Sequence, residues 1–524
     1  MTPILQPGER AEGAKRLEAP RQRPARRVRA DLDAPPRPVR TSPGLERSPE
    51  KPSPAIVAGL LAFFGVLYAV GSRLALQAFP YSGDEYSYFL QGELFARGLL
   101  KAPAPSNAGL LWIDHVVIDQ FVRSKYPPGT AALLALGVKA GVPWLVTPLE
   151  GVITLVLVWF TARALMGPRA AMVTLLVLGA SPLFAVEATT FFSHTATTMW
   201  LAASFAAVTA WSLSERKRTL WLPLAGAAIG CAFLTRPVDA VLFGLAIVAL
   251  RSWKVLVLVA LGALPFVAAH FWYQAAVFGS PFTDGYAAYE PTFRAIYGAE
   301  TAEPPLSLLR IVNPLQQWFH FEICASFVSP WTMPGVALLA VFGAVAIPKG
   351  DRARPMRDVA VAIAVVALVA LIPTISSAGD DGPRPRYLTT TLLAVAFLAG
   401  AGWPPARDAM LERIGPRATR IVGAVGIVLG FVLVGSLVIE RGLQVRLRNG
   451  LYEAVHAEGI EQGVVVIRAQ WPTRFARNGP FFDRPVLYLS APATTTVDEI
   501  AEKYPSRPVY EATEGTPWKV VRRR

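Results

Sequence analysis

The sequence predicts an all-α polytopic membrane protein with about eleven transmembrane helices, interfacial helices in its first outer loop and a small C-terminal α/β domain. Of the 524 residues, 53% are hydrophobic and only 17% are charged, so the chain holds more apolar surface than a soluble fold would bury. The apolar residues form runs long enough to cross a bilayer. Lys and Arg gather in the short segments between these runs, which is typical of membrane topology.

The net charge of +14 does not indicate a nucleic-acid-binding protein. The basic residues lie in the N-terminal tail, in short loops and at the closing run 522–524, where they favour a fixed topology and contact with anionic headgroups. We therefore expect a membrane and no nucleic acid among the partners. The two cysteines, Cys231 and Cys324, are too few and too far apart for a disulfide framework or a zinc site.

The N-terminal part begins with residues 1–53, which are rich in Pro, Arg, Ala and Glu and lack apolar periodicity, so we expect a disordered basic cytoplasmic tail. Residues 55–76 are long enough to span and form an uncleaved anchor that runs outward. A mixed-charge outer loop follows, from 79 to about 129. Within it, 84–99 has the apolar spacing of an interfacial helix. Residues 130–140 are too short to cross and predict a second interfacial helix or a re-entrant piece.

The remaining spans are predicted from apolar runs. The distribution of basic residues among the loops between them provides a test of this topology. The runs lie at 144–163, 170–187, 195–213, 220–235, 238–250, 255–276, 331–347, 358–375, 387–403 and 420–440. Basic residues then fall in alternate loops, which are placed together in the cytoplasm: 163–169, 215–218, 251–254, 349–357 and 407–420. The run 238–250 is short for a span, and it is expected to be tilted or broken near Arg236-Pro237. Losing this span would invert the topology of everything after it.

On the outer side this leaves the first loop, a long loop at 278–330, the turn 376–386 and the tail after Glu440. In the tail, short buried strands are predicted at 463–467, 485–489 and 508–510. The domains are therefore the tail 1–53, a transmembrane domain 54–440 and a small periplasmic α/β domain 441–524. The last has no glycine-rich phosphate loop, so nucleotide binding has no support.

Asp84 and Glu85 are adjacent carboxylates that follow the first span. A carboxylate at the membrane–water boundary is partly desolvated and can be reached by a lipid-borne and a water-borne molecule, which suits a general base. The alternative is structural, because acidic residues at a helix N-terminus favour the macrodipole and Ser82 or Asp84 could cap the helix.

Several cationic groups flank other apolar runs. Lys125 ends the first loop, where it would meet a lipid phosphate or simply snorkel beside the Pro127-Pro128 turn. Arg236 and Asp239 lie between two apolar runs, where charge is costly, so either a ligand phosphate or a pair that closes the turn is expected.

Three further groups lie near predicted outer surfaces. Arg386 and Tyr387 stand at the mouth of a span and would bind an anion or anchor the interface. His194 begins a span and His115 lies in the first loop; both, with Asp239, are candidates for acceptor binding or for structural support. A divalent metal on His194 with a carboxylate has no supporting ligand spacing, so we expect no cofactor.

Together these motifs resemble the membrane glycosyltransferases of superfamily C, specifically the protein O-mannosyltransferase and aminoarabinose transferase group (glycosyltransferase family 39-like). The resemblance covers roughly residues 55–440 and is based on Asp84-Glu85, Lys125-Tyr126-Pro127-Pro128-Gly129, Leu234-Thr235-Arg236-Pro237 and Arg386-Tyr387-Leu388. That family uses a polyprenyl-phosphate-linked sugar as donor and a first-loop aspartate as base. The resemblance implies that Asp84 deprotonates or orients the acceptor hydroxyl, with Glu85 beside it. It also implies that the leaving lipid phosphate is neutralised by Lys125, Arg236 and Arg386.

The chain departs from its relatives at two places: the Pro-rich turn Arg384-Pro385-Arg386 is tighter than expected, and a second acidic position is changed. Many of them carry a second acidic residue where the fourth span begins, whereas this chain has Ser193-His194, with Glu187 a few residues earlier. The resemblance implies a bacterial inner-membrane enzyme that transfers a hexosyl or pentosyl group to a lipid, glycan or protein acceptor on the periplasmic face.

Two other functions are alternatives. The first is a transporter or lipid flippase, which the sequence disfavours because the polar residues cluster at one face and the halves show no internal repeat. The second is a non-catalytic assembly protein, in which Asp84 would be dispensable.

Overall fold

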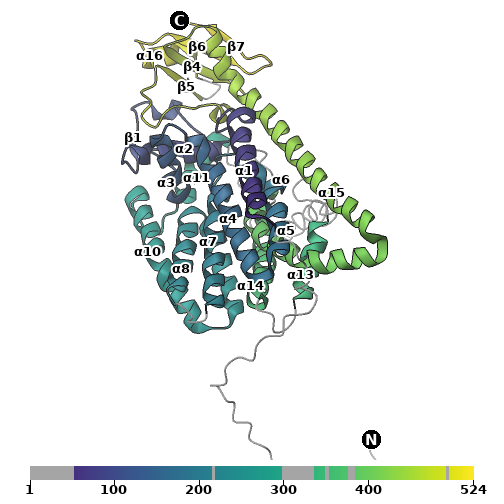
Figure 1. Cartoon of the computed structure of the whole chain (residues 1–524). Helices are drawn as coiled ribbons and strands as arrows, with labels where there is room; N and C mark the ends of the chain where they lie inside the picture. The colour runs from purple at the N-terminus through teal and green to yellow at the C-terminus, as the bar shows by residue number, and fades with distance from the viewer. Residues whose placement is uncertain (1–51, 215–218, 298–334, 348–352, 376–383, 491–494) are drawn as a thin grey trace, which may run out of the picture.

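The computed structural model describes residues 52–214, 219–297, 335–347, 353–375, 384–490 and 495–524. Long helices form a bundle, short helices and strands form a layer over one end of it, and a small sheet covers this layer (Figure 1). Almost all of the predicted tail 1–53 and most of the predicted turn 376–386 lie outside the described residues.

The bundle consists of apolar helices. Five segments are long and apolar enough to cross a membrane: Pro54–Ala75, Pro143–Met166, His194–Leu213, Trp253–Phe278 and Thr389–Ala457. They contain α1 (Pro54–Val70), α4 (Val146–Met166), α7 (His194–Leu213), α10 (Trp253–Phe278) and α15 (Leu392–Ala457). Shorter bundle helices are α5 (Pro168–Gly179), α6 (Pro182–Glu187), α8 (Trp221–Thr235), α9 (Pro237–Ala246), α13 (Val336–Ala346) and α14 (Arg354–Ile375). The fold is thus that of a multi-pass membrane protein, while the number of about eleven spans stays a prediction.

Glycines let neighbouring helices approach closely. A Cβ atom at Gly226 of α8 would lie 1.9 Å from the carbonyl oxygen of Val259 on α10, and one at Gly262 would lie 2.0 Å from that of Pro223. Both faces of the α8–α10 crossing therefore need glycine, as is typical of helix pairs packed in a membrane.

The predicted spans 387–403 and 420–440 fall largely in α15, which consists of two helical arms separated at Gly415, where φ is +78°. Glycine adopts this left-handed conformation without strain, and Pro416 then begins the next helical stretch. Figure 1 shows the second arm rising from the bend to the small sheet. The helix also continues past the predicted boundary at 440 as far as Ala457.

The layer over the bundle is built mainly from the first loop. The predicted interfacial helices correspond to α2 (Gly83–Ala96) and α3 (Pro128–Lys139). Between them lies an antiparallel sheet that was not predicted, β1 (Ala102–Pro103), β3 (Phe121–Ser124) and β2 (Val116–Ile118), with Val116 opposite Ser124. Its strands are too short to show alternation in sequence. A further helix, α11 (Gly285–Tyr297), lies within the predicted loop 278–330, of which residues 298–330 are not described.

The C-terminal sheet has the order β5-β4-β6-β7. Strands β4 (Gly463–Arg468), β5 (Val486–Leu489) and β6 (Val509–Thr513) are parallel and correspond to the three predicted strands, while β7 (Lys519–Arg522) is antiparallel. Helix α16 (Val497–Lys503) accompanies them. The buried residues of β4 share one hydrophobic core with Leu90 and Ile113 of the first loop, so the sheet is packed onto that loop.

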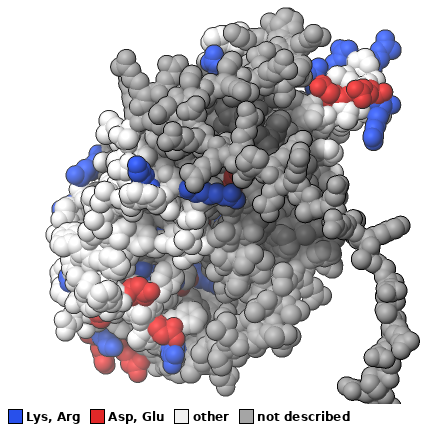
Figure 2. Space-filling view, turned by 90° about the horizontal axis from the view of Figure 1, so that it is seen from below, with Lys and Arg blue, Asp and Glu red and all other residues white. Residues whose placement is uncertain are grey.

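Short turns of helix connect these elements: the π-helical turn η1 (Gly71–Ala75) and the 3-10 turns η2 (Ala108–Leu110), η3 (Pro143–Leu145), η4 (Ile247–Leu250), η7 (Arg384–Thr391) and η8 (Pro472–Arg474). The chain breaks between α8 and α9 at Arg236, where φ is −145° and ψ is 93°, as expected for the run 238–250 near Arg236-Pro237, and α9 continues into η4. Seen from below, the described Lys and Arg side chains are spread singly or mixed with acidic ones, rather than gathered in one basic face (Figure 2).

Candidate active site

The start of α2 places the two adjacent carboxylates in opposite roles. Ser82 caps the helix, because its Oγ accepts from Glu85 N at 3.1 Å while Glu85 Oε2 accepts from Ser82 N at 3.0 Å. Glu85 also accepts from the backbone N–H groups of Tyr81 at 2.8 Å and Phe191 at 3.1 Å, and it is 1% exposed. Burial raises the pKa of Glu85 despite these hydrogen bonds. Glu85 thus points inward and ties α2 to the segment before α7.

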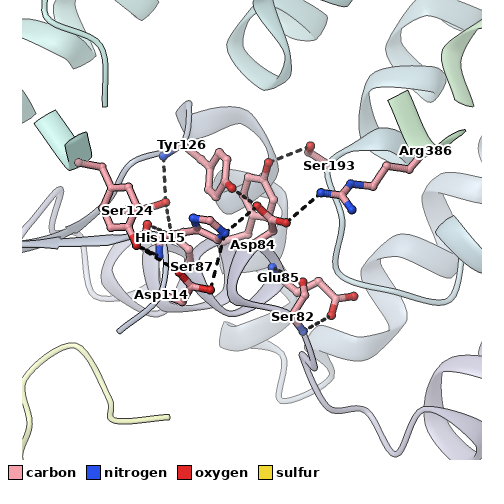
Figure 3. A network of polar contacts seen from close by, with 12 residues as sticks. Ser82, Asp84, Glu85, Ser87, Asp114, His115, Ser124, Tyr126, Ser193 and Arg386 are labelled. Carbon is pink, nitrogen blue, oxygen red and sulfur yellow. Dashed lines mark hydrogen bonds and ion pairs between the residues drawn. The ribbon is translucent and has the colours of Figure 1, made fainter. Parts of the chain in front are cut away.

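Asp84 points the other way, into a set of cationic and phenolic groups (Figure 3). Its Oδ1 accepts from the Tyr126 hydroxyl and lies 3.5 Å from His115 Nε2, and its Oδ2 accepts from Arg386 Nη2 at 3.2 Å. Burial alone would raise the pKa of Asp84, but the charges of His115, Arg386 and Lys125 outweigh burial and hold the pKa well below its usual range. Asp84 is therefore an anion at neutral pH.

The lowered pKa of Asp84 makes stability depend on pH. A carboxyl group with a lowered folded-state pKa stabilises the fold above its unfolded pKa of about 3.9, and this contribution is lost as the pH falls. We expect the native chain in detergent to lose more thermal stability than Asp84→Asn between about pH 6 and pH 3. Thermal unfolding at the two pH values measures this difference, and equal losses in both proteins would contradict it.

Lys125 is buried in a cage of tyrosine rings. Its ammonium nitrogen lies 5.1, 4.8 and 4.9 Å from the ring centroids of Tyr126, Tyr286 and Tyr289. Burial lowers the pKa of Lys125, although the charge of Asp84 opposes this shift. The side chain does not snorkel at the surface, since the residue is only 9% exposed. Its ammonium instead faces the same space as the Asp84 carboxylate.

Helix α11 supplies two of the three rings because it approaches the backbone of Lys125 closely. A Cβ atom at Gly285 would lie 1.9 Å from the carbonyl oxygen of Lys125, which is closer than any side chain allows. Tyr289 also donates its hydroxyl to Asp114 Oδ1 at 3.1 Å. The glycine is therefore what allows α11 to close this side of the site.

Arg236 and Asp239 form the ion pair that the turn suggested, with 2.8 Å between Nε and Oδ2. The pair does more than close a turn. Asp239 Oδ1 accepts from the Thr390 hydroxyl at 2.7 Å, which ties α9 to η7, the element that carries Arg386. Arg236 Nη1 also donates to Ser193 Oγ at 3.4 Å.

Two stacked tyrosines connect Arg236 with Asp84. The hydroxyl oxygen of Tyr88 lies 3.0 Å from Ser193 Oγ. The ring of Tyr88 is stacked on the ring of Tyr126, with the two centroids 4.4 Å apart. Since Tyr126 donates to Asp84, the predicted residues Asp84, Lys125, Arg236 and Arg386 converge on one region. Sequence reasoning quoted Tyr126 in a motif without giving it a role, and it missed Tyr88 and Ser193 as partners.

His194 is paired with a carboxylate of α6. Its Nδ1 is 3.1 Å from Glu187 Oε2, and both side chains are almost fully buried. The histidine therefore pairs with the earlier acidic residue noted in the sequence. Within the described ranges, no group of three or more His, Cys, Asp or Glu side chains is arranged to hold a metal ion. The side chain of Tyr387 lies outside the described part of the structure.

Arginines from the C-terminal part hold the loop just before Asp84. The Tyr81 carbonyl oxygen accepts from Arg448 Nη1 at 2.7 Å and from Arg477 Nη2 at 3.0 Å, while Arg441 of α15 donates to the Tyr81 hydroxyl. The guanidinium of Arg477 also lies 4.6 Å from the centroid of the Tyr86 ring on α2. The position of Asp84 thus depends on residues more than 350 positions further along the chain.

Residues 127–278 match the family described as dolichyl-phosphate-mannose-protein mannosyltransferase. This match covers less than half of the chain; it includes Arg236 and His194 but begins after Lys125. No curated protein sequence matches the chain.

The fold is similar to that of ArnT from Cupriavidus metallidurans bound to undecaprenyl phosphate, with a TM-score of 0.55, 16% identity, and coverage of 88% of this chain and 93% of that chain. The apo state of ArnT gives the same TM-score and coverage at 18% identity. The oligosaccharyltransferase AglB from Archaeoglobus fulgidus matches at a TM-score of 0.45 and 12% identity, over 87% of this chain and 69% of that chain. The ArnT likeness establishes the fold. With the family match, it confirms the resemblance to superfamily C that the motifs indicated.

Proposed function

We propose that this chain is a glycosyltransferase of the bacterial inner membrane that moves a sugar from a polyprenyl-phosphate donor to an acceptor at the periplasmic face. One observation carries the proposal: the Asp84 carboxylate lies directly beside Arg386 and His115, with Lys125 close enough to lower its pKa, in a membrane protein with the ArnT fold. The N-terminus would then lie in the cytoplasm, and the C-terminal sheet in the periplasm.

The proposed sugar transfer requires a carboxylate and several cationic groups. Displacement at the anomeric carbon needs a group that orients or deprotonates the acceptor hydroxyl, and we propose Asp84 as this base. It also needs fixed positive charge where the leaving phosphate oxygens gain negative charge, and Lys125, Arg236 and Arg386 supply it. Cations held in place by an aromatic cage and by ion pairs need little rearrangement as that charge develops.

The similarity to ArnT supports the proposed class of donor. The ArnT crystal structure contains undecaprenyl phosphate, so a polyprenyl phosphate is the carrier we propose here, with a hexosyl or pentosyl group attached. The acceptor would be a lipid, glycan or protein. The matched family and the ArnT fold do not favour the transporter or flippase alternative.

The test is sugar release from a panel of radiolabelled polyprenyl-phosphate sugars by the purified chain in lipid vesicles. Consumption of a donor, with a labelled product or slow hydrolysis, would support the proposal. If no donor in a broad panel is consumed, the glycosyltransferase proposal fails, and transport across the vesicles becomes the next measurement.

The C-terminal residues after Glu440 are proposed to help choose the acceptor. Deleting residues 445–524 can disprove this role but cannot prove it. The deletion also removes Arg448 and Arg477, which donate to the Tyr81 carbonyl oxygen. Unchanged activity and acceptor preference would discard the idea. Lost activity would show only that the Asp84 loop needs its support.

Gly285→Ala is expected to lower the rate of sugar transfer by about a hundredfold, since displacing catalytic groups by about 1 Å costs that much. The added methyl group would push α11 away from the Lys125 backbone and open the tyrosine cage. The transfer rate of the purified variant in vesicles measures the effect. The matched control is Gly59→Ala on α1, where a Cβ atom has no neighbour within 4 Å. Equal rates in both variants would show that the close approach of α11 is unimportant.

A further inference from the structure

An apolar cavity of about 530 Å³ lies between α5, α13 and the two arms of α15. Figure 1 shows α13 and the bend between these arms away from the C-terminal sheet. Among the described residues that line the cavity, only Arg413 is charged. Such a cavity does not hold ordered water, because water there would find too few polar partners. The lining therefore suits an occupant that is apolar over most of its length and negatively charged at one end.

The cavity opens toward the surface that would face lipid. Leu338 and Phe342 of α13 are 48% and 53% exposed, and Val422 of the second arm is 50% exposed, although all three line the cavity. Large apolar side chains exposed together on a bundle of membrane-spanning helices contact lipid. The acyl chains of a bilayer lipid can therefore enter the cavity from the side.

The first arm of α15 separates its charges between two faces. The residues that line the cavity recur three or four positions apart, as expected for one face of a helix: Trp403, Ala406, Ala409, Met410, Arg413 and Ile414. Asp408 and Glu412 lie between these positions, on the opposite side of the helix. In this fully described arm a guanidinium, and no carboxylate, lines the cavity, which favours an anionic group at that end.

Further basic residues stand at the bend. Arg417 and Arg420 follow Gly415 within the next two turns, and both are exposed. Arg420 Nε donates to the Pro416 carbonyl oxygen at 3.3 Å. These residues belong to the loop 407–420, which the positive-inside rule places in the cytoplasm. The basic end of the cavity thus lies at the predicted cytoplasmic surface, where anionic headgroups gather.

The depth of the cavity matches one leaflet of a bilayer. Val173 and Val177 of α5 line it and lie five and nine residues after Pro168, the first residue of that helix. These spacings correspond to about 8 and 14 Å along the helix axis. Half of a hydrocarbon core is about 15 Å thick. The acyl chains of an inner-leaflet lipid would therefore reach the apolar lining while its headgroup stays at the arginines.

The cavity is separate from the candidate active site. Arg386, which contacts Asp84, is 27 positions before Arg413, and the first arm of α15 lies between them. The residues proposed to bind the donor phosphate are Lys125, Arg236 and Arg386, and none of these three lines the cavity. A lipid held at Arg413 would thus be a different molecule from the sugar donor.

We propose that the cavity binds an anionic glycerophospholipid of the inner leaflet, with its acyl chains between α13 and the two arms of α15 and its phosphate at Arg413. The inference uses the predicted topology, but it does not depend on sugar transfer. The outer end of the second arm carries Arg441 and Arg448, which contact Tyr81. A lipid between the arms would therefore also stabilise the helix that supports the loop before Asp84.

The experiment is native mass spectrometry of the delipidated full chain in detergent, titrated with phosphatidylglycerol or with phosphatidylcholine of the same acyl chains. We expect one phosphatidylglycerol to bind about fivefold more tightly than phosphatidylcholine, the usual effect of one arginine beside an anionic headgroup. Arg413→Gln should remove this preference and leave the binding of phosphatidylcholine unchanged. The control is Arg446→Gln, at an exposed position near the outer end of the same helix, which should keep the preference.

A second pair of variants tests the apolar part of the cavity. A Cβ atom at Gly426, which lines the cavity, meets nothing within 4 Å, so Gly426→Leu adds its side chain to the cavity without a clash. We expect both lipids to bind about tenfold more weakly, the effect of displacing about two methylene groups from apolar contact. Gly435→Leu is the control, because a Cβ atom there is equally unobstructed but lies outside the cavity lining. Saturating phosphatidylglycerol should raise the Tm of the native chain and of Gly435→Leu, but not that of Gly426→Leu.

Equal binding of the two lipids by the native chain would overturn the inference, and this measurement needs no variant. A native preference in Arg413→Gln, or native binding by folded Gly426→Leu, would do the same. If undecaprenyl phosphate displaces phosphatidylglycerol and its own binding is lost in Gly426→Leu, the occupant named here is wrong. Each of these outcomes leaves the glycosyltransferase proposal standing, since the donor panel tests that proposal by itself.

Discussion

Asp84→Asn is expected to lower the rate of sugar transfer by about a hundred- to ten-thousandfold. The substitution keeps the size of the side chain but removes the charge that orients and accepts from the acceptor hydroxyl, at a carboxylate 3.5 Å from His115 Nε2. It also leaves the guanidinium of Arg386 facing an amide. The measurement is single-turnover transfer from the polyprenyl-phosphate sugar identified in the donor panel, by purified protein in vesicles.

The chain contains a matched control for this substitution. Thr496-Val497-Asp498-Glu499 begins α16 with the same capping box as Ser82-Gly83-Asp84-Glu85, and Asp498 is exposed. If Asp84 served only the helix dipole, Asp84→Asn and Asp498→Asn would each cost about 0.3–1 kcal/mol of stability and leave transfer unchanged. We expect that outcome for Asp498→Asn alone. Full transfer by a folded Asp84→Asn variant would refute the assigned role of Asp84.

Arg386→Ala is expected to lower kcat for transfer by about a hundred- to a thousandfold. This is the usual effect of removing one positioned group that stabilises the negative charge developing in the transition state. Arg386 is 5% exposed, and it contacts Asp84 and the face of the Phe192 ring, 5.1 Å from its centroid. Removing it would also raise the pKa of Asp84, because one of the lowering charges is lost.

The size of the Arg386 effect should depend on geometry as well as charge. Arg386→Lys restores a cation but not the planar group that contacts Asp84 and Phe192 together, so its kcat should fall between those of the native chain and Arg386→Ala. The control is Arg523→Ala, which removes an exposed ion pair with Glu511 and should leave kcat unchanged. An Arg386→Ala enzyme with native kcat and KM would mean that this arginine only supports the fold.

Local structure at the site could be predicted where it depends on nearby residues. The helix over 84–99 followed from apolar spacing, and Ser82 was one of two residues expected to cap it, because both features are set within a few positions of the chain. The strands of the C-terminal sheet followed from short buried runs of β-branched residues. What the sequence did not show is that Asp84 and Glu85, one position apart, point to opposite sides.

Contacts between distant segments could not be predicted in the same way. Arg386 and Asp84 are 302 positions apart, and no local pattern indicates that they pair. Helix α11 and the sheet of β1 to β3 were missed because one lies in a mixed polar segment and the other has strands of two to four residues. The boundary at 440 was placed where hydropathy falls, although the backbone continues as helix to Ala457.

The arginines that hold Tyr81 have a consequence for the timing of biosynthesis. Tyr81 and Arg477 are 396 positions apart, which at about 5–20 residues per second corresponds to about 20–80 s of translation. During that interval the first loop is already made, but Arg448 and Arg477 have not yet reached the Tyr81 carbonyl. A nascent chain therefore lacks the support of its reactive carboxylate until synthesis is nearly complete, and truncated products would enter the membrane in an inactive state.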